Sequence, residues 1–158
     1  RRVGVIATQG TVNSGAYQQA ICQIDENIEV YSSAAPRLVE YVEQGILSGD
    51  KLNEAICGYI QPLLAKDIDV LIMGCTHFPL IEGPISACAG SGVKVISSAV
   101  ETAADVKKIL AAHNIAAPPG GMPTRIFYET GYGSHFFEVG KMFLGEDITD
   151  VISINLEL

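Results

Sequence analysis

The stretch DVLIMGCTH, residues 69–77, decides how this chain folds. Residues 69–73 predict a strand, because a short continuous apolar run is typical of a strand buried on both faces. The run ends in Gly74-Cys75-Thr76-His77, and Pro79 then permits a new helix. Ligands of open parallel sheets bind beyond the carboxyl ends of the strands. The stretch therefore predicts a parallel sheet and a loop that is placed to carry chemistry.

Strands and helices alternate on both sides of this stretch. Further strands are predicted at residues 3–7, 28–31, 93–96, 125–128 and 151–154. Helices are predicted at residues 14–21, 36–45, 50–63, 101–110 and 136–143, and residues 118–123 form the clearest linker. Such alternation implies βαβ units, so we expect an α/β fold in which a parallel sheet lies between helices.

Composition excludes several classes of protein. The chain has 158 residues, enough for one or two compact units, and its 48% hydrophobic and 18% charged residues indicate a globular protein. The net charge of -8 argues against a nucleic-acid partner, because phosphate contacts need clustered Lys and Arg. Since no apolar stretch approaches the roughly 20 residues that cross a bilayer, we expect no membrane partner. The start, Arg1-Arg2 directly before a strand, is what we expect of a chain cut before a core element.

The four cysteines are Cys22, Cys57, Cys75 and Cys88, with no CxxC pair among them. We therefore expect no zinc site, no disulfide framework, and reduced thiols in a cytoplasmic protein. Three of the four lie on predicted helices beside apolar neighbours and are interpreted as small core residues. Cys75 differs because it follows a strand.

Two loops carry polar groups at strand ends. Residues 8–15 (TQGTVNSG) match neither GxGxxG nor a P-loop, yet they could offer hydroxyls to a carboxylate. An ordinary strand–helix turn rich in capping residues explains them equally well. In the second loop, the thiol of Cys75 precedes a helix start, where its pKa can be lowered, and His77 could ionise or orient it. Cys75 could instead be a buried core cysteine, or Cys75 and His77 could be the nucleophile and base of a Cys–His hydrolase.

Several segments together resemble the glutamate racemases of the aspartate/glutamate racemase family. Gly74-Cys75-Thr76-His77-Phe78-Pro79-Leu80 is similar to their second cysteine motif. Residues 3–17 resemble the opening of their second domain, and residues 36–45 the helix before the cysteine strand. Residues 127–131 with 143–145 are similar to their C-terminal strand and helix. The resemblance runs along essentially the whole chain.

The resemblance implies racemisation of glutamate without cofactor or metal, by two cysteines on opposite sides of the substrate Cα. Cys75 would take the proton from L-glutamate, with His77 assisting it and Thr76 binding substrate. Glu43 would be a nearby carboxylate, although its residue type alone favours a solvated helix position. Thr8 and Thr11 would line the cleft.

Other motifs of that family are absent from this sequence. Its first domain carries an Asp-Ser pair, a Pro-Tyr-Gly segment and a Cys-Asn-Thr motif with the partner cysteine, and none of these occurs here. Ser97 also stands where the family usually has Asp. By resemblance, residues 1–96 are most of the second domain, and residues 97–158 return to an incomplete first α/β domain.

We accordingly expect an isomerase that is inactive as the isolated chain and forms a homodimer. Its role would be the supply of D-glutamate for peptidoglycan and so for cell-wall biogenesis and cell shape. The alternative is a non-catalytic, racemase-like module that binds glutamate or another chain.

Overall fold

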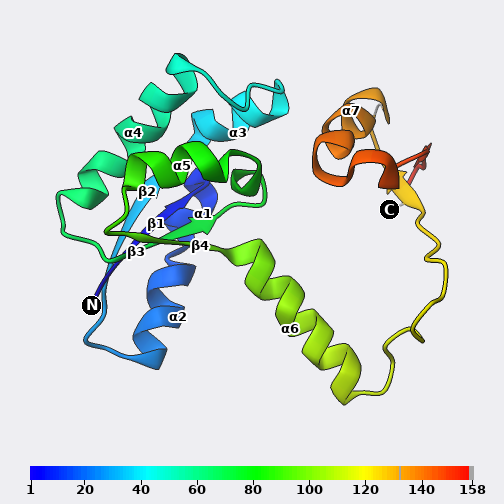
Figure 1. Ribbon diagram of the computed structural model, residues 1–158, viewed down its shortest axis with the longest axis horizontal. Helices are drawn as coiled ribbons and strands as arrows, with labels where there is room; N and C mark the ends of the chain where they lie inside the picture. The colour runs from blue at the N-terminus through cyan, green and yellow to red at the C-terminus, as the bar shows by residue number, and fades with distance from the viewer. Residues whose placement is uncertain (132, 157–158) are drawn as a thin grey trace. The chain divides into compact units, whose positions relative to one another are not determined.

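The computed structural model describes residues 1–131 and 133–156 and divides into two compact units, Arg1–Ile109 and Leu110–Leu158. The first unit is built on a four-stranded sheet of order β2-β1-β3-β4 in which all pairs are parallel. Its strands are β1 (Arg2–Ala7), β2 (Glu29–Ala34), β3 (Val70–Gly74) and β4 (Lys94–Ser97). The parallel sheet predicted from the alternation is confirmed (Figure 1).

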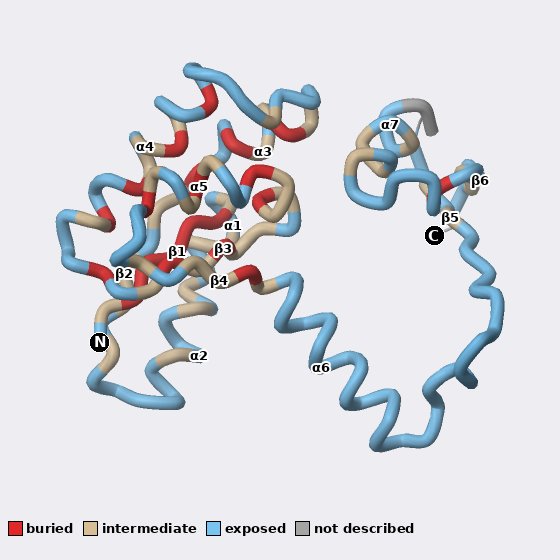
Figure 2. Tube along the Cα trace, viewed as in Figure 1, coloured by how far each residue is buried: buried red, intermediate tan, exposed pale blue. Residues whose placement is uncertain are grey.

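Helices cover both faces of this sheet. One layer consists of α3 (Pro36–Glu43), α4 (Asp50–Leu64) and α5 (Glu82–Ala89), and the other of α1 (Gln9–Ser14) and α2 (Ala16–Ile24). Alternate side chains of β1 point to opposite layers: Val3, Val5 and Ala7 pack with residues of α1 and α2, whereas Ile6 packs with α3, α4 and α5. The buried residues follow the sheet and the inner faces of the helices (Figure 2). The three-layer α/β/α arrangement is thus confirmed.

The layer of α3, α4 and α5 packs on the sheet largely through α4. Leu52, Ile56, Ile60 and Leu63 are its buried residues, and they recur at helical spacing on one face. Burying such a side chain stabilises the fold by about 1.5–3 kcal/mol. The predicted helix of residues 50–63 is confirmed, and so is the helix that begins with Pro36 at its first position.

The segment expected to be a loop after β1 is mostly helical. Thr8 is the N-cap of α1, because its side chain accepts a hydrogen bond from the backbone N–H of Thr11. Gly15 then adopts φ 65°, a left-handed conformation that ends α1 and separates it from α2. Ser14, at the start of the predicted helix of residues 14–21, accepts a hydrogen bond from the N–H of Ala16 at this break.

Two expectations about cysteines were wrong. Cys57 of α4 and Cys88 of α5 form a disulfide with Cα atoms 5.8 Å apart, where we expected reduced core thiols. The sequence could not show this, since 31 residues separate the two and only the packing of α4 against α5 joins them. Cys22 is exposed on α2 rather than part of a core, and Cys75 is half-buried.

The second unit contains a two-stranded parallel sheet. Its strands are β5 (Phe127–Glu129) and β6 (Val151–Ser153), connected through α7 (Gly133–Leu144) and the short η2 (Gly145–Asp147). Ile148 is buried and packs so close to Gly140 that a Cβ there would meet it at 2.7 Å. Along the chain, α6 (Ser98–Ala112) follows β4. Residues 118–123, before β5, have no helix or strand, as expected for a linker.

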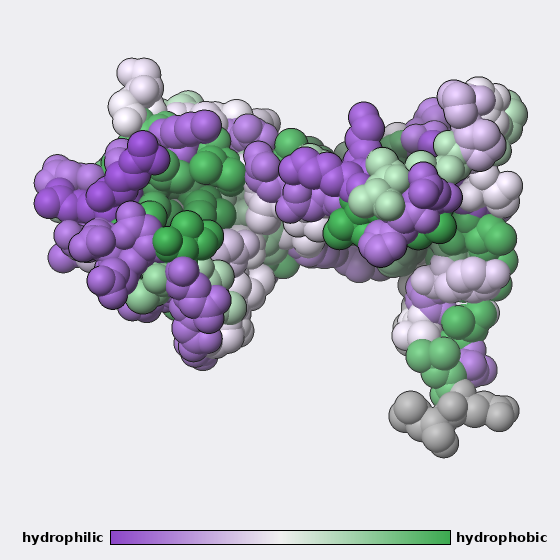
Figure 3. Space-filling model, turned by 90° about the horizontal axis from the view of Figure 1, so that it is seen from below, coloured by the Kyte–Doolittle hydropathy of each residue, from purple (hydrophilic) through white to green (hydrophobic). Residues whose placement is uncertain are grey.

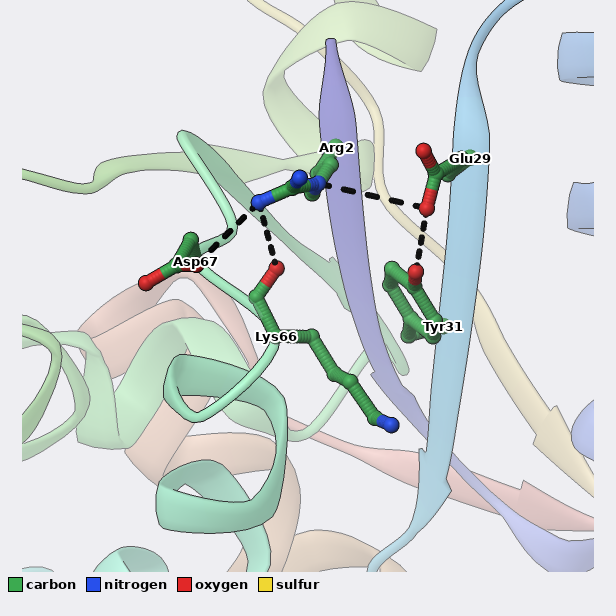
Figure 4. A network of polar contacts seen from close by, with 5 residues as sticks. All are labelled: Arg2, Glu29, Tyr31, Lys66 and Asp67. Carbon is green, nitrogen blue, oxygen red and sulfur yellow. Dashed lines mark hydrogen bonds and ion pairs between the residues drawn. The ribbon is translucent and has the colours of Figure 1, made fainter.

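The amino ends of β1 and β2 are joined to the α4–β3 turn by a polar network (Figure 4). Arg2 donates to the carbonyl of Lys66 at 3.3 Å and to the carboxylate of Asp67 at 3.2 Å. On its other side Arg2 faces Glu29, which accepts a hydrogen bond from Tyr31. That hydrogen bond raises the pKa of Tyr31. The network ties together the sheet end opposite Cys75.

None of the helices in residues 1–131 and 133–156 combines the length and apolar character that a membrane span requires.

Candidate active site at the carboxyl edge of the sheet

The two polar loops meet at one edge of the sheet. Ala7 of β1 pairs with Gly74 of β3, and the chain leaves these residues as Thr8 and Cys75. Because paired parallel strands end side by side, both loops begin at neighbouring positions. This is the edge at which parallel α/β sheets bind ligands.

Cys75, His77 and Glu43 form a line of three side chains. The sulfur of Cys75 lies 3.7 Å from Nδ1 of His77, and Nε2 of the same ring lies 2.5 Å from Oε1 of Glu43. Glu43 comes from the last turn of α3, 34 residues earlier in the chain. The side chains of His77 and Glu43 are 23% and 31% exposed, so water only partly screens their contact. Glu43 is therefore a partner of His77, in contrast to the solvated carboxylate that its residue type favours.

The tautomer of His77 follows from its neighbours. A carboxylate only accepts, so the bond to Glu43 uses Nε2–H as donor. In the neutral ring Nδ1 is then an acceptor that faces the thiol, and a proton can pass from the sulfur to the ring. The three residues can act as a relay that ionises Cys75.

Burial raises the pKa of the Cys75 thiol. Backbone N–H groups of His77, Phe78 and Thr76 act in the opposite direction, but more weakly. The expectation of a lowered pKa was therefore wrong, because the thiol lies deeper beside the core than a loop position suggests. A thiolate with a raised pKa is the stronger base once it has formed.

The threonines expected at the site have different surroundings. Thr8 and Thr11 contact each other through their hydroxyls at 2.9 Å, in addition to the bond by which Thr8 caps α1. Thr11 also lines a small cavity of about 150 Å³ beside Tyr17. Thr76 is exposed next to Cys75. The structure thus places all three at the carboxyl edge of the sheet.

Two contacts that support the Cys75 loop could not be predicted from the sequence pattern. A Cβ on Gly74 would lie 2.9 Å from the ring of Tyr17 and 3.2 Å from Cβ of Ala7, so a larger residue would require the ring or the strand to shift. Ser98 donates to the carbonyl of Met73 at 2.8 Å and fixes the strand just before the loop. Both contacts link residues far apart in the chain, so spacing could not reveal them.

Ser97 is buried, and its hydroxyl has no hydrogen-bond partner among the described residues. It occupies the position at which the resemblance leads one to expect Asp.

Within residues 1–131 and 133–156, no cluster of three or more His, Cys, Asp and Glu side chains could hold a metal ion.

The thiol of Cys75, the imidazole of His77 and the carboxylate of Glu43 thus lie in line at the carboxyl edge of a parallel α/β sheet. Residues 1–106 match the model of the Asp/Glu/Hydantoin racemase family. The chain belongs to this family.

Relatives within the family are glutamate racemases. The chain is 41% identical to the glutamate racemase of Corynebacterium diphtheriae over 150 residues, which are 95% of this chain and 56% of that protein. It matches the crystal structure of glutamate racemase isoform RacE1 from Bacillus anthracis with a TM-score of 0.89 and 36% identity, covering 98% of this chain and 57% of that one. The structure of the Francisella tularensis glutamate racemase in complex with D-glutamate matches with a TM-score of 0.88 and 32% identity, over 98% and 57% of the two chains. This chain therefore spans little more than half the length of these relatives.

Proposed function

We propose that this chain provides one half of a two-cysteine glutamate racemase site, with Cys75 as the base that acts on L-glutamate. The observation that carries the proposal is the line from Cys75 through His77 to Glu43. The match to glutamate racemases along 95% of the chain supports glutamate as the substrate.

The relay accounts for the first proton transfer. Nδ1 of His77 takes the proton of the Cys75 thiol, and the carboxylate of Glu43 stabilises the imidazolium that results. The thiolate then removes the α-proton of L-glutamate, whose Cα keeps the electron pair as a carbanion. An acid on the opposite face gives Cα a new proton and so forms D-glutamate. These steps need neither a cofactor nor a metal, and the opposite acid is by resemblance the partner cysteine of the family.

Hydroxyls at the carboxyl edge are suited to hold the substrate carboxylates. Thr76 is exposed beside the thiol, and its hydroxyl can donate to the carboxylate on Cα. Thr8 and Thr11 follow the neighbouring strand and can contact the other carboxylate if their mutual hydrogen bond is exchanged. This assignment of Thr8, Thr11 and Thr76 deepens the proposal and is tested with it.

We assign residues 1–96 to the second domain of the racemase and residues 97–158 to the part that returns to its first domain. The match covers 56% of the relative's length, which is compatible with one domain together with part of another. Val100, Val106 and Ile109 are exposed on α6, and apolar patches reach the surface between hydrophilic ones (Figure 3). Such residues favour contact with further protein, in a homodimer or with the rest of the racemase. The biological role proposed is cytoplasmic supply of D-glutamate for peptidoglycan.

The test is a circular dichroism assay of L-glutamate with the purified chain, alone and with added protein. The addition is the portion of the Corynebacterium diphtheriae racemase that lies outside the match. We expect the circular dichroism of L-glutamate to stay constant with the chain alone and to decay with the mixture. The Cys75→Ala variant should abolish this decay. Normal turnover by the isolated chain would contradict the two-cysteine account.

A non-catalytic module is the second candidate, and the raised pKa of Cys75 favours it, because a protonated thiol is a poor base. It predicts that glutamate shifts the amide signals of residues 74–77 in an NMR titration, while the mixture still leaves L-glutamate unchanged. Turnover in the mixture would exclude it.

A further inference from the structure

A groove of about 750 Å³ lies between α3 and α4, and its lining residues come from these two helices and the turn between them. On α3, Arg37 and Tyr41 are four residues apart and share one helix face. On α4, Lys51 and Tyr59 are eight residues apart and face the same space. Glu43 belongs to α3 but does not line this groove, so the groove is separate from the relay.

The lining of the groove is net positive although the protein is acidic. Arg37 and Lys51 are two of only ten basic residues in a chain of net charge -8. Glu54 adds one carboxylate to the lining, which leaves the cations in excess. The lining therefore carries one net positive charge, which favours an anion over a cation.

Arg37 is held in place before any ligand binds. Its Nη2 donates to the hydroxyl of Tyr41 at 3.0 Å, and its guanidinium lies 5.7 Å from the centre of the Tyr41 ring. The guanidinium keeps further N–H groups for a second acceptor, because it has five. Less side-chain freedom is then lost when an anion binds.

The lining of the groove contains an exposed glycine that packing does not require. Gly58 lies inside α4, and a Cβ built there would have no atom within 4 Å. Glycine destabilises the interior of a helix relative to alanine, so it has a cost without a packing reason. Gly58 lines the groove together with Tyr41 and Tyr59, and without a side chain it leaves its part of the groove open.

We propose that this groove binds a small anion that carries a flat ring, as a phosphate ester or a carboxylate. Arg37 and Lys51 hold the anionic group, and the rings of Tyr41 and Tyr59 contact the flat part. Gly58 provides the space. Binding does not depend on the chemistry of Cys75, so the proposal stands or fails apart from the racemase function.

The experiment is an amide NMR titration of the chain with phenyl phosphate, repeated with phenol and with inorganic phosphate. Phenyl phosphate is expected to shift signals of α3 and α4 in a saturable way, with an affinity at least about tenfold above that of either fragment. Added salt should weaken binding, because the groove is exposed. Equal binding of inorganic phosphate, or shifts that map outside the groove, would overturn the proposal.

Variants locate the binding. Gly58→Leu places a side chain in the groove and should abolish the shifts, whereas Gly10→Leu, in α1 with equally open surroundings, should leave them unchanged. Arg37→Met and Lys51→Met should each lower the affinity about tenfold, while Lys107→Met on α6 should not. Because the two Met variants change exposed side chains only, they remain informative if Gly58→Leu does not fold. Signals of α3 and α4 that move with protein concentration alone would show a second copy in the groove and contradict the proposal.

Discussion

The two ends of the same sheet carry polar networks of different kinds. At the carboxyl edge, His77 and Glu43 are 23% and 31% exposed and lie in line with a half-buried thiol. At the amino edge, Arg2 is 42% exposed, and its partners Glu29 and Asp67 are 58% and 87% exposed. Water screens the second network far more than the first. The comparison teaches that burial, more than the number of charges, separates a network suited to chemistry from one that only joins strands.

The largest effect is expected from the carboxyl edge. Glu43→Gln keeps an oxygen that can accept from His77 but removes the charge that stabilises the imidazolium. In the complemented racemase we expect the L-glutamate turnover rate to fall by about 10–100-fold, since a hydrogen bond to a charged group contributes about 1.5–3 kcal/mol. The circular dichroism assay measures this. Glu40→Gln, on an exposed position of the same helix, is the control, and an equal loss there would refute the relay.

The next effect concerns the support of the same edge. Gly74→Ala places a Cβ 2.9 Å from the Tyr17 ring, so either the ring or β3 must shift. We expect the free energy of unfolding in urea to fall by about 1–3 kcal/mol, as for other overpacked sites. Gly58→Ala, where a Cβ meets open space, should be neutral or stabilising. When Tyr17→Leu is added to Gly74→Ala, part of the lost free energy of unfolding should return. If none returns, the Tyr17 ring is not what the new Cβ meets.

The thiol gives a pH-dependent test of burial. Because the pKa of Cys75 is raised in the folded chain, the thiolate forms at higher pH than in the unfolded chain. The alkylation rate by iodoacetamide should therefore rise later with pH in the folded chain than in urea, and folding stability should decrease as pH rises through this interval. Cys22→Ser leaves Cys75 as the single free cysteine for the measurement. A rise of the alkylation rate at lower pH in the folded chain than in urea would contradict the effect of burial.

The smallest effect is expected at the amino edge. Arg2→Met removes the contacts to Glu29 and Asp67 but keeps an apolar stem, so the free energy of unfolding should fall by no more than about 1 kcal/mol. Urea denaturation at low and high salt measures the change, which should shrink at high salt. A loss larger than that of Gly74→Ala would reverse the comparison between the two edges.

The sequence by itself determined the strands and the layers. Residues 69–73 predicted β3 because a continuous apolar run suits a strand with a helix layer on each side. The stripe from Leu52 to Leu63 predicted α4 because helical spacing places its apolar residues on one face. These are local patterns, and the physical chemistry of neighbouring residues is sufficient to read them. The motif at residues 74–77 also marked the loop where the site lies, although the helix of residues 9–14 was missed because the capping bond of Thr8 is not visible in composition.

Only the tertiary structure decided how the site is assembled. Glu43 reaches His77 across 34 residues, and the Cys57–Cys88 disulfide spans 31. Tyr17 lies against Gly74, although 57 residues separate them. The direction of the Cys75 pKa depends on how deeply packing buries the thiol. Each of these depends on how distant elements pack together, and a local pattern holds no information about which distant side chain will lie within hydrogen-bond or van der Waals distance.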